Sequence, residues 1–205
     1  SIATVSFFTV SANKLPLFGK VIYLDAGHGG LDPGALYKSI KEKDINLKIV
    51  YTLKQKLEEN GATVYLTRYG DYDLSVPNAM NRKRSDLSRR ANMINDSMCD
   101  MYISIHLNAE SSSSWSGAQV FYDDVNKENE RLAKIIQNEF RKNTATKREY
   151  KLTNEMYMYK RIKIVGVLVE VGFISNPNER YILRQNWYQN KISNIITNGI
   201  IKYFS

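Results

Sequence analysis

The sequence predicts an α/β fold: a single domain with a mostly parallel, twisted sheet covered by helices on both faces. Short apolar runs rich in β-branched residues recur along the chain, and segments with helical spacing of apolar residues separate them. With 205 residues, of which 43% are hydrophobic, the chain suits one compact core. Strands that alternate with helices imply right-handed crossovers between parallel neighbours.

The first half of the predicted domain contains three strands and two helices. The first strand, 21–25, is an apolar run that ends in a glycine-rich loop. Apolar residues on one face predict a helix over 45–57, which Asn60-Gly61 ends, and the strand 62–67 follows. After a polar loop, Leu87, Met93 and Ile94 indicate a basic helix with one buried side, and the third strand is 101–105.

The second half continues the alternation. A strand at 120–122 follows the break Trp115-Ser116-Gly117, and spacings of three and four residues predict a helix over 132–140. The apolar run 167–171 predicts another buried strand, and isoleucines on one face predict a closing helix over 192–200. We therefore assign residues 20–205 to one domain.

Residues 1–19 form an N-terminal extension with two interpretations. Its apolar stretch ends in Val10-Ser11-Ala12, a context typical of signal-peptide cleavage, but it has no start methionine and no basic lead. It is either the remnant of a secretory or anchoring segment or an edge strand. No run of about twenty apolar residues is present, so the sequence predicts no membrane span.

The net charge of +8 predicts an anionic partner: nucleic acid, a membrane surface or a carboxylate-rich wall polymer. The basic residues of the 82–94 segment fit a solvated helix face, and the tyrosines form no stacking motif, so we expect no nucleic-acid binding. The single cysteine, Cys99, excludes an intramolecular disulfide and a cysteine-based zinc cluster. Any metal must be held by imidazoles and carboxylates.

The chain has two histidines, and both lie where a predicted strand ends. Functional groups collect at the carboxyl ends of parallel strands, so His28 and His106 are candidates for metal or proton chemistry. Glu170 interrupts the apolar run VGVLVEVGF, where a carboxylate needs a metal, a cation or strong hydrogen bonds to stay ionised. The alternative for Glu170 is an inward-facing residue paired with an arginine.

Catalytic zinc usually takes three protein ligands, so two histidines leave one ligand to find. The candidates from the residues alone are Asp25, Asp32, Glu42, Asp44 and Glu170. Asp25 has a second interpretation, orienting an imidazole or bonding loop amides. Glu42 also has a second interpretation, because Ser39-Ile40-Lys41-Glu42 matches a capping box at the start of a helix. Two histidines and one carboxylate also suit a non-haem iron oxygenase, on a different scaffold.

The chain resembles the zinc-dependent N-acetylmuramoyl-L-alanine amidases of the amidase-3 type over about residues 20 to 204. The resemblance is carried by LDAGHGGLDPGA, EKDINL, YLTRYGD, LSRRANMIN, YISIHLNA, WSGAQVFY and VLVEVGFISNPNE, in the family's order. It implies one Zn²⁺ per chain held by His28, Glu42 and His106, with Glu170 as the catalytic carboxylate. It also implies hydrolysis of the amide between the lactyl group of N-acetylmuramic acid and L-alanine in peptidoglycan.

Within the family, the chain is most similar to the sporulation branch, which removes stem peptides so that a partner deacetylase can form the muramic lactam of spore cortex. That likeness implies an extracytoplasmic enzyme, secreted or membrane-anchored, between the membranes of the developing spore. The alternatives are a general cell-wall autolysin, or a weakly active homologue that depends on an accessory sporulation protein. Membrane proximity would come through a missing N-terminal segment.

Two departures from the family's pattern concern loop stiffness and substrate fit. Ala26 stands where proline is frequent, and Val165-Gly166 stands where Pro-Ala is common. Three further residues keep two interpretations each. Arg68 and Arg90 either bind substrate carboxylates or form structural salt bridges, and Asn108 either bonds substrate or ends its strand.

Overall fold

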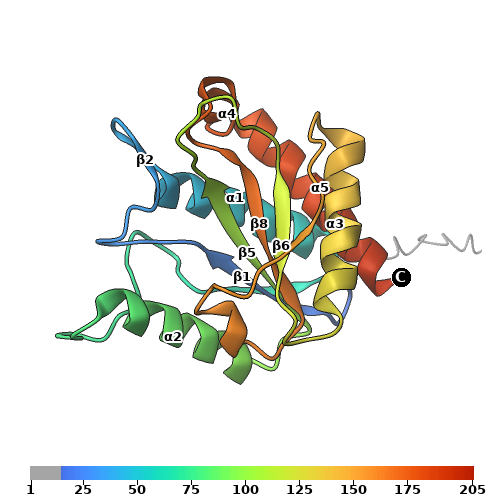
Figure 1. Cartoon of the computed structure of the whole chain (residues 1–205). Helices are drawn as coiled ribbons and strands as arrows, with labels where there is room; N and C mark the ends of the chain where they lie inside the picture. The colour runs from blue at the N-terminus through green and yellow to red at the C-terminus, as the bar shows by residue number, and fades with distance from the viewer. Residues whose placement is uncertain (1–14) are drawn as a thin grey trace, which may run out of the picture.

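A computed structural model describes residues 15–205 of the chain, and Figure 1 shows their arrangement. Of the predicted extension, residues 1–14 lie outside the described part, while 16–19 form a turn whose Leu17 side chain is fully buried. The boundary at residue 20 stays a prediction. No helix in the described range is long and apolar enough to cross a membrane.

The centre of the molecule is a six-stranded sheet in the order β4-β1-β5-β8-β6-β7. Four of its five strand pairs are parallel, and β6 runs antiparallel to β8, so the predicted mostly parallel sheet is confirmed. Its strands are β1 (Val21–Ala26), β4 (Thr63–Leu66), β5 (Met101–Asn108), β6 (Gln119–Tyr122), β7 (Lys151–Leu152) and β8 (Gly166–Phe173).

All four predicted helices are present: α1 (Glu42–Glu59), α2 (Arg82–Asp96), α3 (Asn129–Asn143) and α5 (Asn186–Phe204). The structure adds small elements that the periodicity did not predict. They are the hairpin β2 (Leu36–Tyr37) with β3 (Ile40–Lys41), the strand β7, the 3₁₀ turn η1 (Tyr159–Arg161) and the short helix α4 (Pro177–Ile182). Each has at most six residues, too few for a helical or alternating pattern to show.

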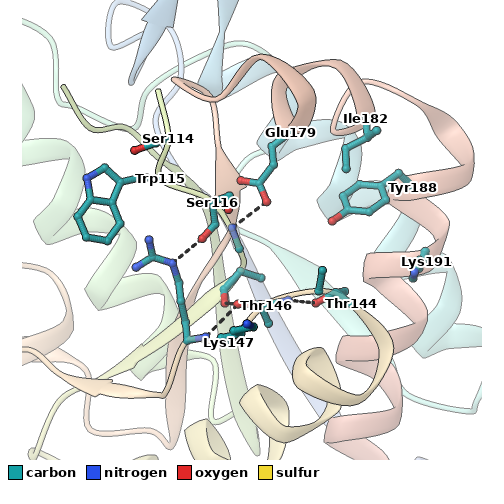
Figure 2. A pocket seen from close by; sticks show the side chains of 14 residues that line it. Ser114, Trp115, Ser116, Thr144, Thr146, Lys147, Glu179, Ile182, Tyr188 and Lys191 are labelled. Atoms are coloured by element: carbon teal, nitrogen blue, oxygen red, sulfur yellow. Dashed lines mark hydrogen bonds between the residues drawn. The ribbon is translucent and has the colours of Figure 1, made fainter. Parts of the chain in front are cut away.

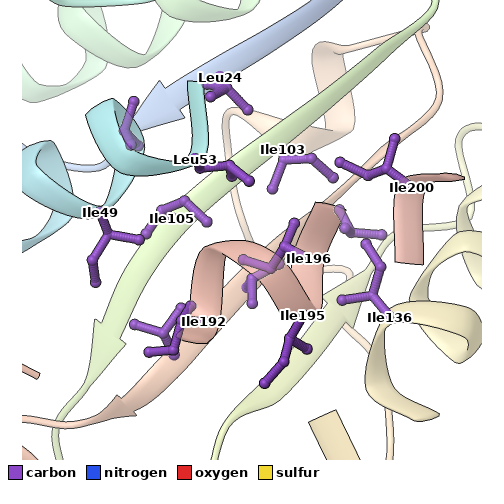
Figure 3. Close-up of a cluster of buried hydrophobic side chains, with 14 of the residues drawn as sticks. Leu24, Ile49, Leu53, Ile103, Ile105, Ile136, Ile192, Ile195, Ile196 and Ile200 are labelled. Atoms are coloured by element: carbon purple, nitrogen blue, oxygen red, sulfur yellow. The ribbon is translucent and has the colours of Figure 1, made fainter. Parts of the chain in front are cut away.

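The two faces of the sheet are covered differently. Helices α1, α3 and α5 pack on one face around a large, mainly aliphatic cluster, part of which Figure 3 shows. On the other face, α2 and η1 cover a smaller cluster that contains Tyr23, Tyr102 and Tyr159. Figure 1 shows α2 apart from the three other long helices. We call these the aliphatic face and the aromatic face.

The carboxyl ends of β1, β5 and β8 lie side by side because these strands are parallel neighbours. His28 follows β1 by two residues, whereas β5 continues two residues past His106. His106 therefore lies inside its strand, where its register partner on β8 is Glu170, and the pairing becomes irregular just beyond it. The topology alone thus brings one histidine and one carboxylate next to each other.

Candidate metal centre

Three side chains converge at the carboxyl ends of β1 and β5. Glu42 Oε1 lies 3.2 Å from His28 Nε2 and 3.0 Å from His106 Nδ1. One ligand atom from each residue lies within 4.8 Å of the other two, which makes the three a group able to hold a metal ion. The structure therefore brings together the two histidines and one of the five carboxylates that the sequence left open.

Glu42 is the first residue of α1, and its side chain is buried against the strand ends. Its Oε2 accepts a hydrogen bond from the Ala35 amide at 2.8 Å, and its Oε1 accepts one from the Leu107 amide at 3.0 Å. The capping-box interpretation of Glu42 is wrong: Lys41 is the N-cap, with no side-chain cap bond. The residues before α1 form the β2–β3 hairpin instead, which leaves the carboxylate free to face the histidines.

The position of His28 depends on an unusual backbone and on a carboxylate partner. Its φ of +64° is in the left-handed region, where residues other than glycine are uncommon. Its Nδ1 lies 2.8 Å from Asp32 Oδ2; when Nδ1 donates its proton there, the lone pair of Nε2 is available to a metal ion. Gly34 permits this approach, since a Cβ there would lie 2.6 Å from both the His28 ring and the Glu42 carboxylate.

A buried chain of hydroxyl groups lies behind His106. The Tyr159 hydroxyl lies 3.4 Å from His106 Nε2 and 3.0 Å from Ser104 Oγ, and Ser104 Oγ donates to Asp25 Oδ2 at 2.6 Å. If Nε2 carries the proton of the neutral ring, each group donates to the next, and the chain ends on the Asp25 carboxylate. The lone pair of Nδ1 is then available to a metal ion.

Arg68 and Arg90 both make the structural contacts that the sequence offered as one interpretation. Both are buried, and both donate to the Ala26 carbonyl, where β1 ends. Arg90 also binds Asp25 at 2.8 Å, Asp86 at 3.0 Å and the His28 carbonyl at 2.7 Å. The two guanidinium groups therefore hold the loop that carries His28. The Asn108 carbonyl accepts the Ile174 amide at 2.9 Å, which ties the ends of β5 and β8.

Glu170 lies in the same pocket, a cavity of about 340 Å³ also lined by His28, His106 and Tyr159. Its Oε2 atom is buried and has no hydrogen-bond partner among residues 15–205. Burial raises the pKa of Glu170 to about 7; the nearby Glu42 carboxylate adds to the rise, and the two imidazoles oppose it. Neither an arginine nor a capping bond satisfies this carboxylate, so the paired-arginine interpretation is wrong.

The other carboxylates that the sequence offered have different places. Asp25 is buried; burial opposes its ionisation, but Arg90, Ser104 and Thr67 lower its pKa to about 2. The bond from His28 likewise lowers the pKa of Asp32 to about 2. Asp44 is exposed on α1. Asp32 therefore bonds the His28 ring directly, whereas Asp25 bonds Thr67, Ser104 and Arg90 and touches neither imidazole.

The donor set fits zinc. Zinc binds imidazole nitrogen and carboxylate oxygen at roughly 2.0–2.1 Å with tetrahedral geometry, which separates its ligand atoms by roughly 3.3 Å. The two separations from Glu42 Oε1, 3.0 and 3.2 Å, are close to that value. Burial raises the pKa of the Glu42 carboxyl, but its bonds to His106 and His28 outweigh this and hold it well below the usual range. A negative charge between two imidazoles matches what a divalent cation needs.

Two contributors to the site were absent from the sequence-based candidates. Asn46, one turn after Glu42 in α1, donates to Glu42 Oε1 at 3.1 Å. Its spacing of four residues from Glu42 is the signal that could have revealed it. Tyr159 comes from a segment without apolar periodicity, and no local pattern indicates that it reaches His106.

Together, the α/β fold and the two-histidine, one-carboxylate group with a free glutamate beside it define a candidate metal-dependent hydrolase. A family model described as N-acetylmuramoyl-L-alanine amidase matches residues 22–202. The chain therefore belongs to the amidase-3 family of N-acetylmuramoyl-L-alanine amidases, and it is a peptidoglycan hydrolase. Peptidoglycan lies outside the cytoplasm, so the enzyme acts outside the cytoplasm.

Individual relatives agree with this assignment. The chain is 45% identical over 196 residues to a germination-specific N-acetylmuramoyl-L-alanine amidase of Bacillus subtilis, covering 94% of this chain and 83% of that protein. It is 33% identical to the amidase LytC of Bacillus subtilis, of which it spans 39%. Among solved structures it is similar to the CwlD amidase from Clostridioides difficile in complex with the GerS lipoprotein. That match has a TM-score of 0.85 and 42% identity, and it covers 90% of this chain and 98% of the other.

Proposed function

We propose that His28, Glu42 and His106 bind one Zn²⁺ per chain and that Glu170 is the catalytic carboxylate. The proposed reaction is hydrolysis of the amide between the lactyl group of N-acetylmuramic acid and L-alanine. The observation that carries this proposal is the convergence of the three donor atoms, with both histidines lining the pocket that holds the unpartnered Oε2 of Glu170. The family supports it independently.

The roles of the protein groups follow from their surroundings. When bound, zinc supplies Lewis-acid chemistry: it polarises a carbonyl and lowers the pKa of water to about 7. Glu170 accepts the proton of the attacking water on Oε2 and then delivers it to the departing L-alanine nitrogen, because an amine leaves poorly unless protonated. A pKa near 7 suits a group that must both take and give a proton at neutral pH.

We propose that the enzyme acts on spore cortex, removing stem peptides before a deacetylase forms the muramic lactam. The identity of 45% to a germination-specific amidase, against 33% to LytC, favours this role over that of a general autolysin. The similar CwlD structure contains a lipoprotein, so an accessory sporulation protein that supports zinc binding or activity is part of the proposal. The place of action is then between the membranes of the developing spore.

A digest of wall fragments tests both the reaction and the role. Cortex-type and vegetative-type peptidoglycan fragments are incubated with the zinc-loaded chain and with the chelated chain, and the products are identified by mass spectrometry. We expect free peptides that begin with L-alanine, and faster release from cortex-type fragments. Equal release from both types would favour the autolysin, and no release in zinc, even with an added accessory protein, would reject the proposed reaction. Release that requires an added accessory protein would identify the weakly active homologue.

The substitution Glu170→Gln tests the catalytic assignment. We expect it to lower kcat by about 10²–10⁴-fold, the usual contribution of general acid–base catalysis, while zinc still binds. Glu110→Gln, at an exposed glutamate just beyond β5, is the matched control and should leave kcat unchanged. A Glu170→Gln enzyme with undiminished turnover would contradict the assignment, whatever metal the chain holds.

A further inference from the structure

A second cavity, of about 760 Å³, lies outside the metal-site pocket and shares no lining residue with it. Figure 2 shows Ser114 and Trp115 on one side of it and Ile182, Tyr188 and Lys191 on the other. The walls come from the segment before β6, from the segment after α3, and from α4 and α5. The proposed reaction uses none of these residues.

Specific contacts hold the walls in place. Glu179 of α4 accepts hydrogen bonds from the Gly117 amide and the Phe173 amide, both at 2.8 Å, so both of its oxygens are engaged. Gly117 has a φ of +95°, and a Cβ there would lie 2.5 Å from Thr146 Oγ1. Thr146 in turn donates to the Ala118 carbonyl at 2.9 Å. The cavity is therefore a built feature, and both oxygens of its one carboxylate are hydrogen-bonded to backbone amides.

The wall of the cavity before β6 carries the aromatic ring of Trp115, which packs against Arg148. The Arg148 guanidinium lies 5.1 Å from the centre of the Trp115 ring and 4.5 Å from that of Phe173. It also donates to the Ser116 carbonyl at 2.8 Å and to Gln119 Oε1 at 3.2 Å. Trp115 nevertheless remains 50% exposed, so the ring is available to a ligand.

The cavity is positively charged. Lys147 and Lys191 both line it and both are exposed. Among residues 15–205, neither lysine has a carboxylate within 4.0 Å, whereas other lysines near the same helices, such as Lys142 and Lys202, pair with Glu139. Unpaired cations in the same cavity as an exposed aromatic ring match a ligand that combines a sugar ring with carboxylates.

Arg148 links the cavity wall to the strand beside the one that carries Glu170. Gln119, which Arg148 holds, is the antiparallel register partner of Glu170. Ala118 of the cavity belongs to the aliphatic face and Tyr159 beside Glu170 to the aromatic face, so a polymer bound at both sites passes over the carboxyl ends of the parallel strands.

We propose that this cavity is a second peptidoglycan-binding site, in which a sugar ring stacks on Trp115 and stem-peptide carboxylates pair with Lys147 and Lys191. The inference rests on the proposed function, since it takes the same polymer as the substrate. The cavity then has a role distinct from catalysis, because a neighbouring repeat of the polymer binds here while one amide is cleaved at Glu170. Two linked contacts bind a polymer more tightly than either contact alone.

Kinetics on two substrates test this inference with the full, zinc-loaded chain. The substrates are a disaccharide with one stem peptide and a glycan strand with several. We expect Trp115→Ala to raise KM for the strand by about 10-fold and to leave kcat and KM for the single unit within about 2-fold. The Lys147→Ala/Lys191→Ala double variant should act in the same direction. Equal effects on both substrates, or no effect on the strand, would overturn the inference.

A fluorescence titration tests binding separately from cleavage. The chain has two tryptophans, and Trp187 lies outside the lining of this cavity, so Trp187→Phe leaves Trp115 as the reporter. In the Glu170→Gln background, the disaccharide peptide should change the Trp115 emission, and loss of both lysines should weaken that response at least 5-fold. An unchanged emission, or an equal response without the lysines, would reject the second site. The proposed reaction would still stand on peptide release by the native chain.

Discussion

The two faces of the sheet hold the same strands in different ways. On the aliphatic face, α1, α3 and α5 bury isoleucine, leucine and valine side chains that carry no polar groups to satisfy. On the aromatic face, tyrosines share the interior with Asp25, Asp86 and Arg90, all buried and joined by hydrogen bonds. The first arrangement stabilises by burial alone. The second is costly unless every charge is paired, but it fixes the loop that carries His28.

Removing the central cation of the aromatic face should have the largest effect on stability. Arg90→Met leaves Asp25 and Asp86 buried without their partner, which typically costs about 3–5 kcal/mol. We expect a fall of that size in the free energy of unfolding, measured with denaturant in the presence of a chelator, together with weaker zinc binding. Arg89→Ala is the matched control. Arg89 is exposed on the same helix, and its loss should change stability by less than about 0.5 kcal/mol.

A cavity created by substitution on the aliphatic face should lower stability but leave the candidate metal centre unchanged. Leu53 is fully buried between α1 and the sheet, as Figure 3 shows, and Leu53→Ala should cost about 2–5 kcal/mol. Because Leu53 touches no group of the candidate metal centre, the folded variant should bind zinc like the native chain. Gln55→Ala, at an exposed position of α1, provides the control. A large loss of zinc affinity in Leu53→Ala would show that the two faces are coupled.

The acid dependence of stability should also separate the two faces. The pKa of Asp25 is lowered from 3.8 to about 2, so its ionised form stabilises the folded state above pH 3.8. That contribution, on the order of 2 kcal/mol, should be lost as the pH falls from about 4 to 2. Unfolding free energies measured across this range should fall less steeply in Asp25→Asn than in the native chain. Parallel curves would contradict the role given to Asp25.

The contrast between the faces also explains what the sequence could predict. The strands and long helices were predictable because one-sided burial leaves a period of apolar residues, as in α3 and α5. His28, His106 and Glu170 stand out because rare or charged residues interrupt or end apolar strands. Asn60-Gly61 likewise marks the end of α1.

Other parts of the site depend on contacts that no local pattern encodes. From the residues alone, Glu42 fitted a capping box as well as a metal ligand, and the family resemblance was needed to prefer the ligand. The η1 segment has no periodicity, yet it delivers Tyr159 to a strand more than fifty residues away in sequence. The hydroxyl chain to Asp25 is a property of the packed sheet, so the sequence did not reveal it.

The hydroxyl chain from His106 to Asp25 gives the prediction with the smallest expected effect, a change in zinc affinity alone. Tyr159→Phe keeps the buried ring but removes the oxygen 3.4 Å from His106 Nε2, so the imidazole loses the partner that fixes its tautomer. Because outer-shell partners contribute about 10–100-fold to metal affinity and this contact is long, we expect zinc to bind roughly 10-fold more weakly. Competition with a chromophoric chelator measures the change.

Tyr157→Phe is the matched control, because the Tyr157 hydroxyl bonds Arg84 and Ser88 of α2 instead of the site. Its zinc affinity should equal that of the native chain, even if the contact between η1 and α2 loosens. If Tyr159→Phe also bound zinc with native affinity, the aromatic face would act on the site through the arginine-held loop alone. A loss in both variants would instead assign the effect to the docking of the segment 157–161, because both substitutions lie in it and differ in which partner each hydroxyl bonds.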